Sequence, residues 1–465
     1  MKGLIKDLIH QISPNQVLKE PEDLLAYAND ATHYYKSVIP DAVVLPHNTE
    51  DVAKVMKYAS QQNIPVTPRG AGSGLAGGCT PVNGGIVLDM KRMNHLLEID
   101  KGNMTATVEG GVVLGNFQRA VERQNMFYPP DPQSMKVCTL GGNVATRAGG
   151  PRAVKYGTTG NYVLGMEIVL PDGSIIHTGG KFVKQSVGYD LTHLMTGSEG
   201  TLGVISAINL RLLPLPEEHK TMVVVCETLD QAAEIVSEII ANGAVPSMLE
   251  FLIKLAITVF NTYLSPPLPD NGEGFLLMEL DGTTEQINRN IGIIQEICQN
   301  KKATEIRVIH DHQTASVYWN ARANMYPFMM TIFRRVITED ITVPRNLFPQ
   351  YVRSVQEIAA STGVAIGLGG HAGDGNVHPT IMQSEISSEL AQKSEQAIDM
   401  LIKAGLELGG TISGEHGIGI HKKQYLEWEI GTVQIELMKK IKQCFDPLGI
   451  MNPGKIWVEG GVTND

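Results

Sequence analysis

The sequence predicts an α+β protein made of two domains and a C-terminal helical segment. Three observations lead to this fold class: the 465 residues exceed one ordinary domain, the first half alternates strand patterns with glycine-rich turns, and the second half repeats the order strand, helix, strand. Prolines close the first half near position 217. We therefore expect a first domain over residues 1–217, a second over 218–420 and a helical segment over 421–465.

The composition limits the classes of function. Hydrophobic residues make up 43% of the chain and charged residues 19%, and the formal net charge is −11, so no overall basic field would attract DNA, RNA or anionic lipid. The five cysteines are far apart and form no CxxC pair, which argues against a cysteine-ligated iron–sulfur cluster or a structural zinc. We expect no nucleic-acid partner.

Neither a signal peptide nor a membrane-spanning segment is expected. The first residues turn polar too soon for a signal peptide, and no apolar run approaches the roughly 20 residues that cross a bilayer. We therefore expect a cytoplasmic protein, either free or held at the membrane through a partner protein.

The first domain is predicted to combine a small βαβ-type subdomain with a mixed sheet. Residues 1–30 carry helical spacing, and strand patterns at 42–45 and 64–67 then flank an amphipathic helix at 50–62. The later patterns predict strands at 86–89, 105–109, 163–170, 174–177 and 204–212 and a helix at 114–124.

A glycine-rich stretch follows the second strand of the βαβ unit. Gly72, Gly74 and Gly77 match the dinucleotide fingerprint GxGxxG, but that motif must open a helix, and here residues 79–85 break the chain before another strand. We predict instead a loop whose backbone N–H groups converge on an anion such as a pyrophosphate. A loop without a ligand is the alternative. Paired glycines at 141–142, after a proline-rich run, indicate a second stretch of backbone that could line a ligand site.

The second domain is predicted to be a ferredoxin-like antiparallel sheet with helices on one face. The order strand, helix, strand occurs twice, with strands at 221–226, 247–251, 275–280 and 305–309 and helices at 229–241 and 284–299. Further helices are expected at 317–333, 347–361, 387–408 and 433–445, and further strands from 341, at 364–368 and at 376–382.

Two histidines stand on either side of Asp374-Gly375, a dipeptide that favours a two-residue hairpin turn. Such a turn places His371 directly opposite His378, with Cβ atoms roughly 5 Å apart on one face. Both imidazoles could then reach one metal ion. The alternative is a glycine-rich surface loop with incidental histidines.

Six motifs in one order resemble a known family. They are PRGAGSGLAGG (68–78), DPQSMKVCTLGGNVATRAGG (131–150), GSEGTLGV (197–204), GGHAGDGNVHP (369–379), SGEHGIG (413–419) and FDPLGIMNPGKIW (445–457). The chain from about residue 38 resembles the FAD-linked 2-hydroxyacid dehydrogenases of the vanillyl-alcohol-oxidase type. Within that family it is similar to the glycolate oxidase D-subunit, D-lactate dehydrogenases and D-2-hydroxyglutarate dehydrogenases.

The resemblance implies that the first domain binds FAD and that the C-terminal segment returns to the flavin. Covalent relatives attach the flavin to a histidine of the first loop, and residues 68–78 contain none, so the FAD should be non-covalent. The implied cofactor residues are Pro68, Arg69, Gly70, Ala71, Gly72, Ser73, Gly74, Gly77, Gly78, Pro130, Asp131, Ser134, Thr139, Gly142, Asn143, Glu199, Gly200, Ile205 and Asn452, the last beside the isoalloxazine.

The resemblance also implies a catalytic metal site in the second domain. His371, His378 and Glu415 match the family's ligands for a divalent metal (Zn, Fe or Mn), and His416 matches its general base. Adjacent residues of a regular strand point to opposite faces, but the glycines around Glu415 and His416 permit a twisted backbone that serves both roles. Arg322 matches the arginine that binds the substrate carboxylate, and a structural ion pair is the alternative for it.

By this resemblance the protein oxidises a short D-2-hydroxy acid, D-lactate before glycolate, by hydride transfer to flavin N5. Because the vicinity of residues 338–340 lacks the lysine of D-2-hydroxyglutarate dehydrogenases, a monocarboxylate fits better. Electrons would pass to a partner such as an electron-transfer flavoprotein, an iron–sulfur subunit, a cytochrome or a quinone. Three alternatives stay open: a 2-hydroxydicarboxylate dehydrogenase, an electron-carrying subunit of a larger complex, and a metal-dependent hydrolase that lost the flavin.

Overall fold

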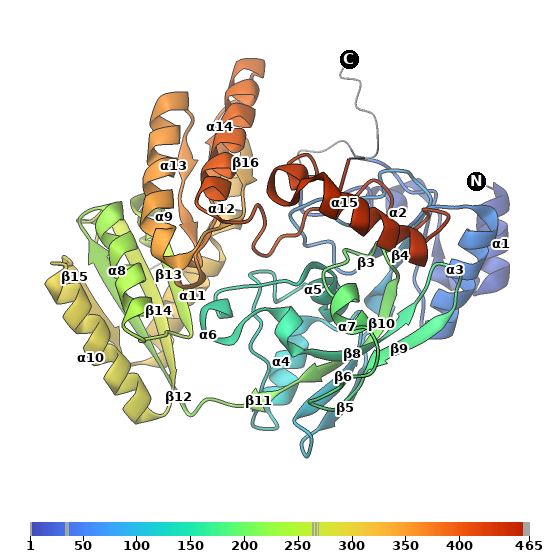
Figure 1. Ribbon diagram of the computed structural model, residues 1–465, viewed down its shortest axis with the longest axis horizontal. Coiled ribbons are helices and arrows are strands. Elements are labelled where there is room, and N and C mark those ends of the chain that lie inside the picture. Colours follow the sequence, from blue (N-terminus) through green and yellow to red (C-terminus); the bar gives the residue numbers. More distant parts are fainter. Residues whose placement is uncertain (1, 33–36, 263–264, 266, 268, 459–465) are drawn as a thin grey trace. The chain divides into compact units, whose positions relative to one another are not determined.

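The computed structural model describes residues 2–32, 37–262, 265, 267 and 269–458 (Figure 1). Its chain divides into two compact units. Unit 1 holds the described residues of Met1–Ala148, Thr158–Leu215 and Glu415–Asp465, and unit 2 holds those of Gly149–Gly157 and Pro216–Gly414. The expected domains over 1–217, 218–420 and 421–465 stay a prediction, and residues 459–465 lie outside the described part of the chain.

Unit 1 begins with the predicted βαβ unit, in a four-stranded sheet. Its strands lie in the order β1 (Val17–Leu18), β2 (Ala42–Val44), β4 (Ile86–Asp89) and β3 (Val66–Arg69), and β2 and β3 both run parallel to β4. The connecting helix α3 (Thr49–Gln62) begins after Asn48, whose side chain accepts a hydrogen bond from the Asp51 N–H. Its apolar face packs on this sheet in one core. The N-terminal helical segment contains α1 (Lys2–Gln11), η1 (Pro14–Gln16) and α2 (Pro21–Leu25).

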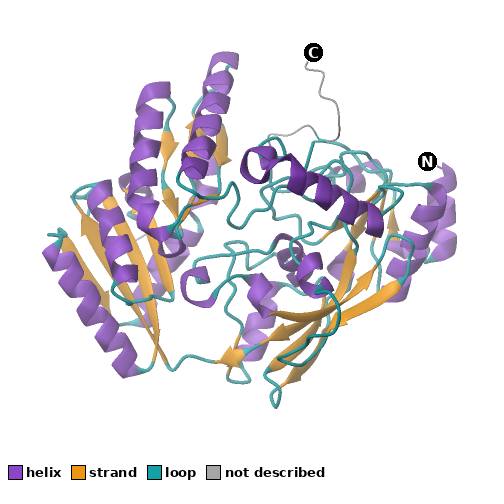
Figure 2. Ribbon diagram, viewed as in Figure 1, coloured by secondary structure: helices purple, strands orange, loops and turns teal. Residues whose placement is uncertain are grey.

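The second sheet of unit 1 is antiparallel throughout, not mixed as predicted. Every pair within it runs antiparallel, so the only parallel pairs among these strands belong to the βαβ sheet. The strands are β5 (Leu96–Asp100), β6 (Thr105–Glu109), β10 (Val204–Arg211), β8 (Val163–Val169) and β9 (Ile175–Gly179), in that order. They are labelled in Figure 1 and drawn as orange arrows in Figure 2. Helix α5 (Leu140–Thr146) packs on β10, and α7 (Leu191–Met195) packs on β8 and β9.

Shorter elements complete unit 1 before its C-terminal part. They are η2 (Met90–Arg92), α4 (Leu114–Glu122), β7 (Met126–Phe127), η3 (Thr159–Tyr162) and β11 (Leu213–Pro214), which pairs with β7.

The C-terminal segment returns to the first sheet of unit 1, and its predicted contact with the flavin stays a prediction. Helix α15 (Leu426–Phe445) begins earlier than the predicted 433, because a kink at Gly431 (φ 71°) interrupts the helical spacing there. Beyond it, Met451 forms a parallel bridge with Val66, and the Asn452 N–H donates to the Val66 carbonyl at 2.8 Å.

Unit 2 contains the predicted ferredoxin-like sheet. Its strands lie in the order β15 (Glu305–Ile309), β12 (Glu218–Cys226), β14 (Gly274–Gly282), β13 (Met248–Ile253) and β19 (Gly369–Gly370), all antiparallel. Helices α8 (Leu229–Ala241) and α10 (Thr284–Asn300) cover one face of it (Figure 1). Contrary to the prediction, the other face is covered too, by α9 (Lys254–Phe260) and α11 (His312–Ala323), whose Phe260 and Tyr318 share a core with Val223 and Val225. Burial on both faces explains the continuous apolar run of β12.

The rest of unit 2 builds the surroundings of the histidine loop. It contains α6 (Ala153–Tyr156), α12 (Met325–Ile332), β16 (Arg335–Thr338), β17 (Ile341–Thr342), η4 (Arg345–Leu347), α13 (Phe348–Thr362), β18 (Ile366–Gly367), η5 (Ala372–Asp374), β20 (Asn376–Val377), β21 (Thr380–Gln383) and α14 (Ser388–Glu407). The predicted strand at 376–382 is split: β20 pairs with β17, whereas β21 pairs with β16 and β18. No helix among the described residues is long and apolar enough to cross a membrane.

Candidate active site

The histidine loop is wider than the predicted two-residue turn. Residues 372–374 form a 3-10 turn, Gly375 adopts a left-handed conformation (φ 84°), and the Asn376 N–H donates to the His371 carbonyl. The His378 N–H donates to the Gly369 carbonyl at 2.7 Å. The predicted register, with residue 371 opposite 378, is therefore wrong. The helical turn takes up two more residues than a type I′ hairpin does.

The two histidines nevertheless meet, as predicted. Their ring centroids are 5.2 Å apart and their rings are nearly perpendicular. The Nδ1 of His371 lies 2.5 Å from Glu250 Oε1, and the Nδ1 of His378 lies 3.2 Å from the Glu339 carbonyl oxygen. Each Nδ1 therefore donates its hydrogen to an oxygen, which leaves each Nε2 as the atom able to bind a metal.

The third predicted ligand joins them. Glu415 directly follows Gly414, the last residue of unit 2, and one ligand atom from each of His371, His378 and Glu415 lies within 4.8 Å of the others. A Cβ on Gly414 would collide with the side chains of Asn376 and Thr342, so only glycine lets the chain pass close enough to place Glu415 here. Two imidazoles and one carboxylate are a ligand set for a divalent metal with open positions.

Glu250 is a site residue that the sequence reasoning missed. It is fully buried on β13, its Oε2 lies 2.6 Å from Arg322 Nε, and its Oε1 holds His371. Burial raises the pKa of the Glu250 carboxyl, but Arg322 and His371 outweigh it and hold that pKa below its ordinary value. A charged residue inside the apolar run 248–252 was the available signal, since such a residue needs a buried partner.

A second acidic pair lies beside His378. Glu339 and Asp340 are both fully buried, and Asp340 Oδ1 lies 3.9 Å from His378 Nδ1. The Ser413 hydroxyl donates to Asp340 Oδ2 at 2.8 Å, which anchors the chain just before Gly414. These residues lie in the stretch 338–340, where D-2-hydroxyglutarate dehydrogenases carry a lysine by the resemblance described above. They place two buried carboxyl groups there instead.

In unit 1 the glycine loop after β3 is held by its carbonyl oxygens. Those of Gly74 and Ala76 accept from the N–H groups of Ala31 and Ile420, and that of Gly78 accepts from the Asn452 side chain at 2.8 Å. Its amide N–H groups are the part that would bind an anion. A Cβ on Gly70 would collide with Thr139, so the loop approaches the start of α5 closely.

The other implied cofactor residues gather near this loop, within unit 1. Ser73 lies 3.4 Å from Ser134 through their hydroxyl oxygens, Pro68 lies against Gly200, and the Thr139 hydroxyl caps α5 through the Gly142 N–H. Asp131, Asn143 and Ile205 are buried, and Ala71, Gly72 and Pro130 lie in the same two loops. Asn452 Oδ1 is buried with no hydrogen-bond partner among the described residues. Closely approaching backbones and a buried polar atom fit an FAD site.

Two of the implied cofactor residues use their charged side chains for hydrogen bonds to the protein backbone. The Glu199 carboxylate accepts from the N–H groups of Ile418 and Gly419 at 2.8 and 2.7 Å, and burial raises the pKa of Glu199. The Arg69 guanidinium donates to the Asn29 carbonyl and lies 3.4 Å from Cys79 Sγ. Contacts of Glu199 and Arg69 with FAD would therefore come from their backbones. Glu199 also anchors the segment that carries His416, whose Nε2 lies 3.9 Å from Glu415 Oε1.

Lys455 is a second residue that the sequence reasoning did not single out. Its Nζ donates to the Thr80 carbonyl at 2.7 Å, and burial lowers its pKa to about 8. Burial also raises the pKa of the nearby Cys79 thiol to about 11. A thiol with that pKa is a packing residue and no nucleophile at neutral pH.

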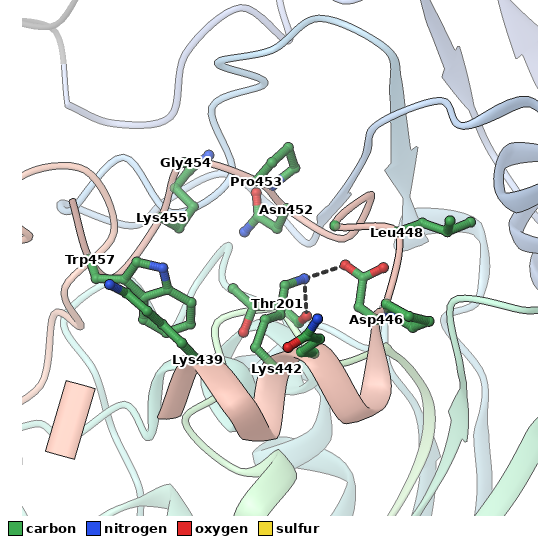
Figure 3. A pocket seen from close by; sticks show the side chains of 13 residues that line it. Thr201, Lys439, Lys442, Asp446, Leu448, Asn452, Pro453, Gly454, Lys455 and Trp457 are labelled. Carbon is green, nitrogen blue, oxygen red and sulfur yellow. Dashed lines mark hydrogen bonds and ion pairs between the residues drawn. The ribbon is translucent and has the colours of Figure 1, made fainter. Parts of the chain in front are cut away.

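A pocket of about 350 Å³ lies beside the C-terminal segment, between α15 and residues 446–457 (Figure 3). Lys439 and Lys442 contribute to its wall, but both are engaged: Lys439 pairs with Glu436, and Lys442 binds Asp446 and the carbonyls of Thr201 and Met451. Lys442 therefore holds the return of the chain, whereas Lys439 pairs within its own helix.

Comparison with known proteins identifies the family. Residues 215–456 match the FAD linked oxidases, C-terminal domain, and residues 40–179 match an FAD binding domain. The glycolate oxidase subunit GlcD of Bacillus subtilis (strain 168) is 41% identical to this chain over 98% of it and 97% of that protein. This chain belongs to the FAD-linked oxidases. The D-lactate dehydrogenase of Anaerostipes hadrus is 34% identical to it over 96% of this chain and 95% of the other.

The fold of this FAD-linked oxidase occurs in more distant proteins. A crystal structure of p-cresol methylhydroxylase with substrate bound matches it with a TM-score of 0.81 at 19% identity, over 98% of this chain and 97% of that one. The family inferred from the six motifs and the α+β fold class are thereby confirmed, and the protein is an FAD-linked oxidoreductase.

Proposed function

We propose that this FAD-linked oxidase is a metal-dependent dehydrogenase that oxidises a short D-2-hydroxy acid to the 2-oxo acid. The observation that carries the proposal is the convergence of His371, His378 and Glu415, with Arg322 joined to His371 through Glu250. The names of its relatives, glycolate oxidase subunit and D-lactate dehydrogenase, support the same class of substrate. D-Lactate is the first candidate and glycolate the second.

The cofactors would supply chemistry that side chains lack. A divalent metal (Zn, Fe or Mn) held by the two histidines and Glu415 would act as a Lewis acid on the substrate hydroxyl. Non-covalent FAD, held by unit 1, would accept the hydride from the substrate Cα.

The protein's own groups would bind the substrate and move its proton. The Nε of Arg322 donates to Glu250, so the two terminal nitrogens of the guanidinium would bind the substrate carboxylate by paired hydrogen bonds. His416, adjacent to the metal ligand Glu415, would accept the proton of the substrate hydroxyl. The structural ion pair considered for Arg322 does exist, and it is compatible with substrate binding because it uses only one edge of the guanidinium.

The stretch 338–340 favours a substrate with a single carboxylate. Glu339 and Asp340 are buried near His378, so a second carboxylate placed there would meet acidic side chains and not a lysine that could bind it. A monocarboxylate therefore fits better than D-2-hydroxyglutarate or another hydroxydicarboxylate.

The electrons would leave through a partner. The chain's five cysteines form no CxxC pair, so it offers no cysteine-ligated cluster of its own to carry electrons onward. We propose that an electron-transfer flavoprotein or an iron–sulfur subunit accepts them. The protein would then be cytoplasmic, or peripheral at the membrane through that partner.

The test is anaerobic reduction of the bound flavin by single substrates. D-Lactate should bleach the visible flavin absorbance fastest, glycolate next, and L-lactate and D-2-hydroxyglutarate slowly or not at all. Chelation of the metal before mixing should slow the reduction, and adding back Zn²⁺ or Mn²⁺ should restore it. Equal rates with D-2-hydroxyglutarate would overturn the substrate class, and unchanged rates after chelation would overturn the role of the metal.

A further inference from the structure

One fully buried carboxylate connects two functional groups of unit 2. Glu250 lies on β13 with 0% of its side chain exposed, between His371 at 4% and Arg322 at 11%. Its two oxygens hold different partners, Oε1 the imidazole and Oε2 the guanidinium, at 2.5 and 2.6 Å. Neither partner is close to it in sequence.

The fold brings these three residues together through the edge of one sheet. Strand β19 adds to the edge of β13 with Gly370 opposite Phe251, so His371 leaves the sheet next to Glu250. Glu250 shares its face of β13 with Leu252, which packs in the core that includes α11, the helix of Arg322. Because an unpaired buried carboxylate is very unfavourable, a carboxylate at this position needs a hydrogen-bond donor, and here it has two.

We propose that Glu250 is a positioning residue that prepares the metal ligand and the substrate-binding arginine together. It accepts the Nδ1 hydrogen of His371, which keeps Nε2 unprotonated and aimed at the metal. It also accepts the Nε hydrogen of Arg322, which fixes the plane of the guanidinium and leaves its terminal nitrogens for the carboxylate of the substrate. The inference rests on the proposed metal-dependent function and adds a residue to it.

A glutamine at position 250 would disrupt this arrangement without changing its size. Arg322 can only donate, so the amide oxygen would face it and the amide NH₂ would face His371. The imidazole would then accept at Nδ1 and carry its hydrogen on Nε2, the atom needed by the metal. Glu250→Gln should therefore weaken metal binding about 10- to 100-fold, the usual effect of losing such a partner.

The same sheet offers a matched control. Glu279 on the neighbouring strand β14 also lies between an arginine and a histidine, Arg152 at 3.9 Å and His219 at 3.4 Å. Neither of these is a proposed metal ligand. Glu279→Gln removes the same charge from the same kind of triad, so any general effect of the substitution should appear in both variants.

The experiment is a titration of the FAD-loaded, metal-depleted protein with Zn²⁺ alone, and separately with Mn²⁺ alone. For Glu250→Gln we expect a metal Kd raised about 10- to 100-fold, with the FAD content unchanged, and for Glu279→Gln a Kd within about twofold of the unaltered protein. Glu250→Asp, which keeps the charge but is too short to reach both partners, should lie between. Equal metal Kd values for Glu250→Gln and Glu279→Gln would overturn the inference.

Two further measurements separate the possible failures. His371→Ala should lose the metal: if it does while Glu250→Gln binds normally, only the inference fails, and if His371→Ala binds normally, the proposed metal function itself fails. Should the Glu250 variants not fold, ¹⁵N-histidine NMR of the unaltered, metal-depleted protein decides. We expect the signal of a hydrogen on Nδ1 of His371, and a hydrogen on Nε2 would overturn the proposal.

Discussion

The glycine loop of unit 1 and the histidine loop of unit 2 use the same residue type for opposite purposes. In unit 1, Gly70 lets the loop backbone pass against the Thr139 side chain, and the loop offers its amide N–H groups to a ligand. In unit 2, Gly370 and Gly414 let chain segments pass so close to Asn376 that charged side chains can meet. The difference shows that a glycine-rich motif does not by itself indicate a site where backbone N–H groups bind a ligand. The predictions below test this contrast, from the largest expected effect to the smallest.

Removing a metal ligand should break the metal site and leave FAD binding at the glycine loop intact. We expect His371→Ala and Glu415→Ala to lose bound metal and turnover on the order of a thousandfold, because the Lewis acid contributes several kcal/mol. The FAD content should not change. Metal analysis and the flavin spectrum of the purified variants measure both, with His312→Ala, an exposed histidine of unit 2, as control. Loss of FAD together with metal would show that the two loops are not independent.

Removing the proposed base should slow the reaction and keep both cofactors. We expect His416→Asn to reduce the rate of anaerobic flavin reduction at least about 100-fold, since a positioned general base contributes that much or more. The bound metal and FAD should match those of the unaltered protein. A normal rate of flavin reduction would remove His416 from the mechanism.

Exchanging single glycines should separate the two loops directly. Gly70→Ala would force a Cβ into Thr139, and Gly414→Ala would force one into Asn376 and Thr342. We expect the first to lower FAD retention about tenfold and the second to lower metal affinity about tenfold, each leaving the other ligand bound, at a cost of about 1–3 kcal/mol. Gly292→Ala on α10, where a Cβ meets nothing within 4 Å, is the control. If both variants lost the same ligand, the contrast between the loops would fail.

The smallest expected effect is a pH dependence confined to unit 2. The hydrogen bond from His219 to Glu279 raises the pKa of His219. The stability that this pair contributes is therefore present below the unfolded pKa of about 6.5 and is lost as the pH rises through the raised folded value. Between pH 6 and 8 we expect the unfolding midpoint to fall slightly more for the unaltered protein than for His219→Gln. The difference should stay below about 1 kcal/mol, because the pair is partly exposed.

Local patterns predicted the elements well because period and turn chemistry are local. The βαβ unit, the ferredoxin-like order and the absence of a Rossmann helix after Gly77 follow from strand and helix spacing within short windows. The geometry of the histidine loop was missed because Asp-Gly favours a two-residue turn, whereas here the chain forms a 3-10 turn first. The kink at Gly431 similarly hid the first turns of α15.

Long-range pairs could not be predicted in this way. Glu250 finds Arg322 across 72 positions and His371 across 121, and no window of sequence contains all three. The prediction also missed that helices cover the second face of the unit 2 sheet, because nothing in the local sequence of α9 and α11 indicates which surface they pack on. The candidate metal ligands were found because motifs, and not spacing, identified Glu415.

The return of the chain to β3 has a consequence for how the protein is made. Asn452 donates to Val66, and Lys455 donates to Thr80 from 375 positions away. A ribosome therefore releases all of residues 216–414, which belong to unit 2, before it releases the residues that complete unit 1. Contacts of such separation form late. The nascent chain should expose an unfinished flavin-binding unit until residues 452–455 have emerged from the ribosome, and FAD can be captured firmly only then.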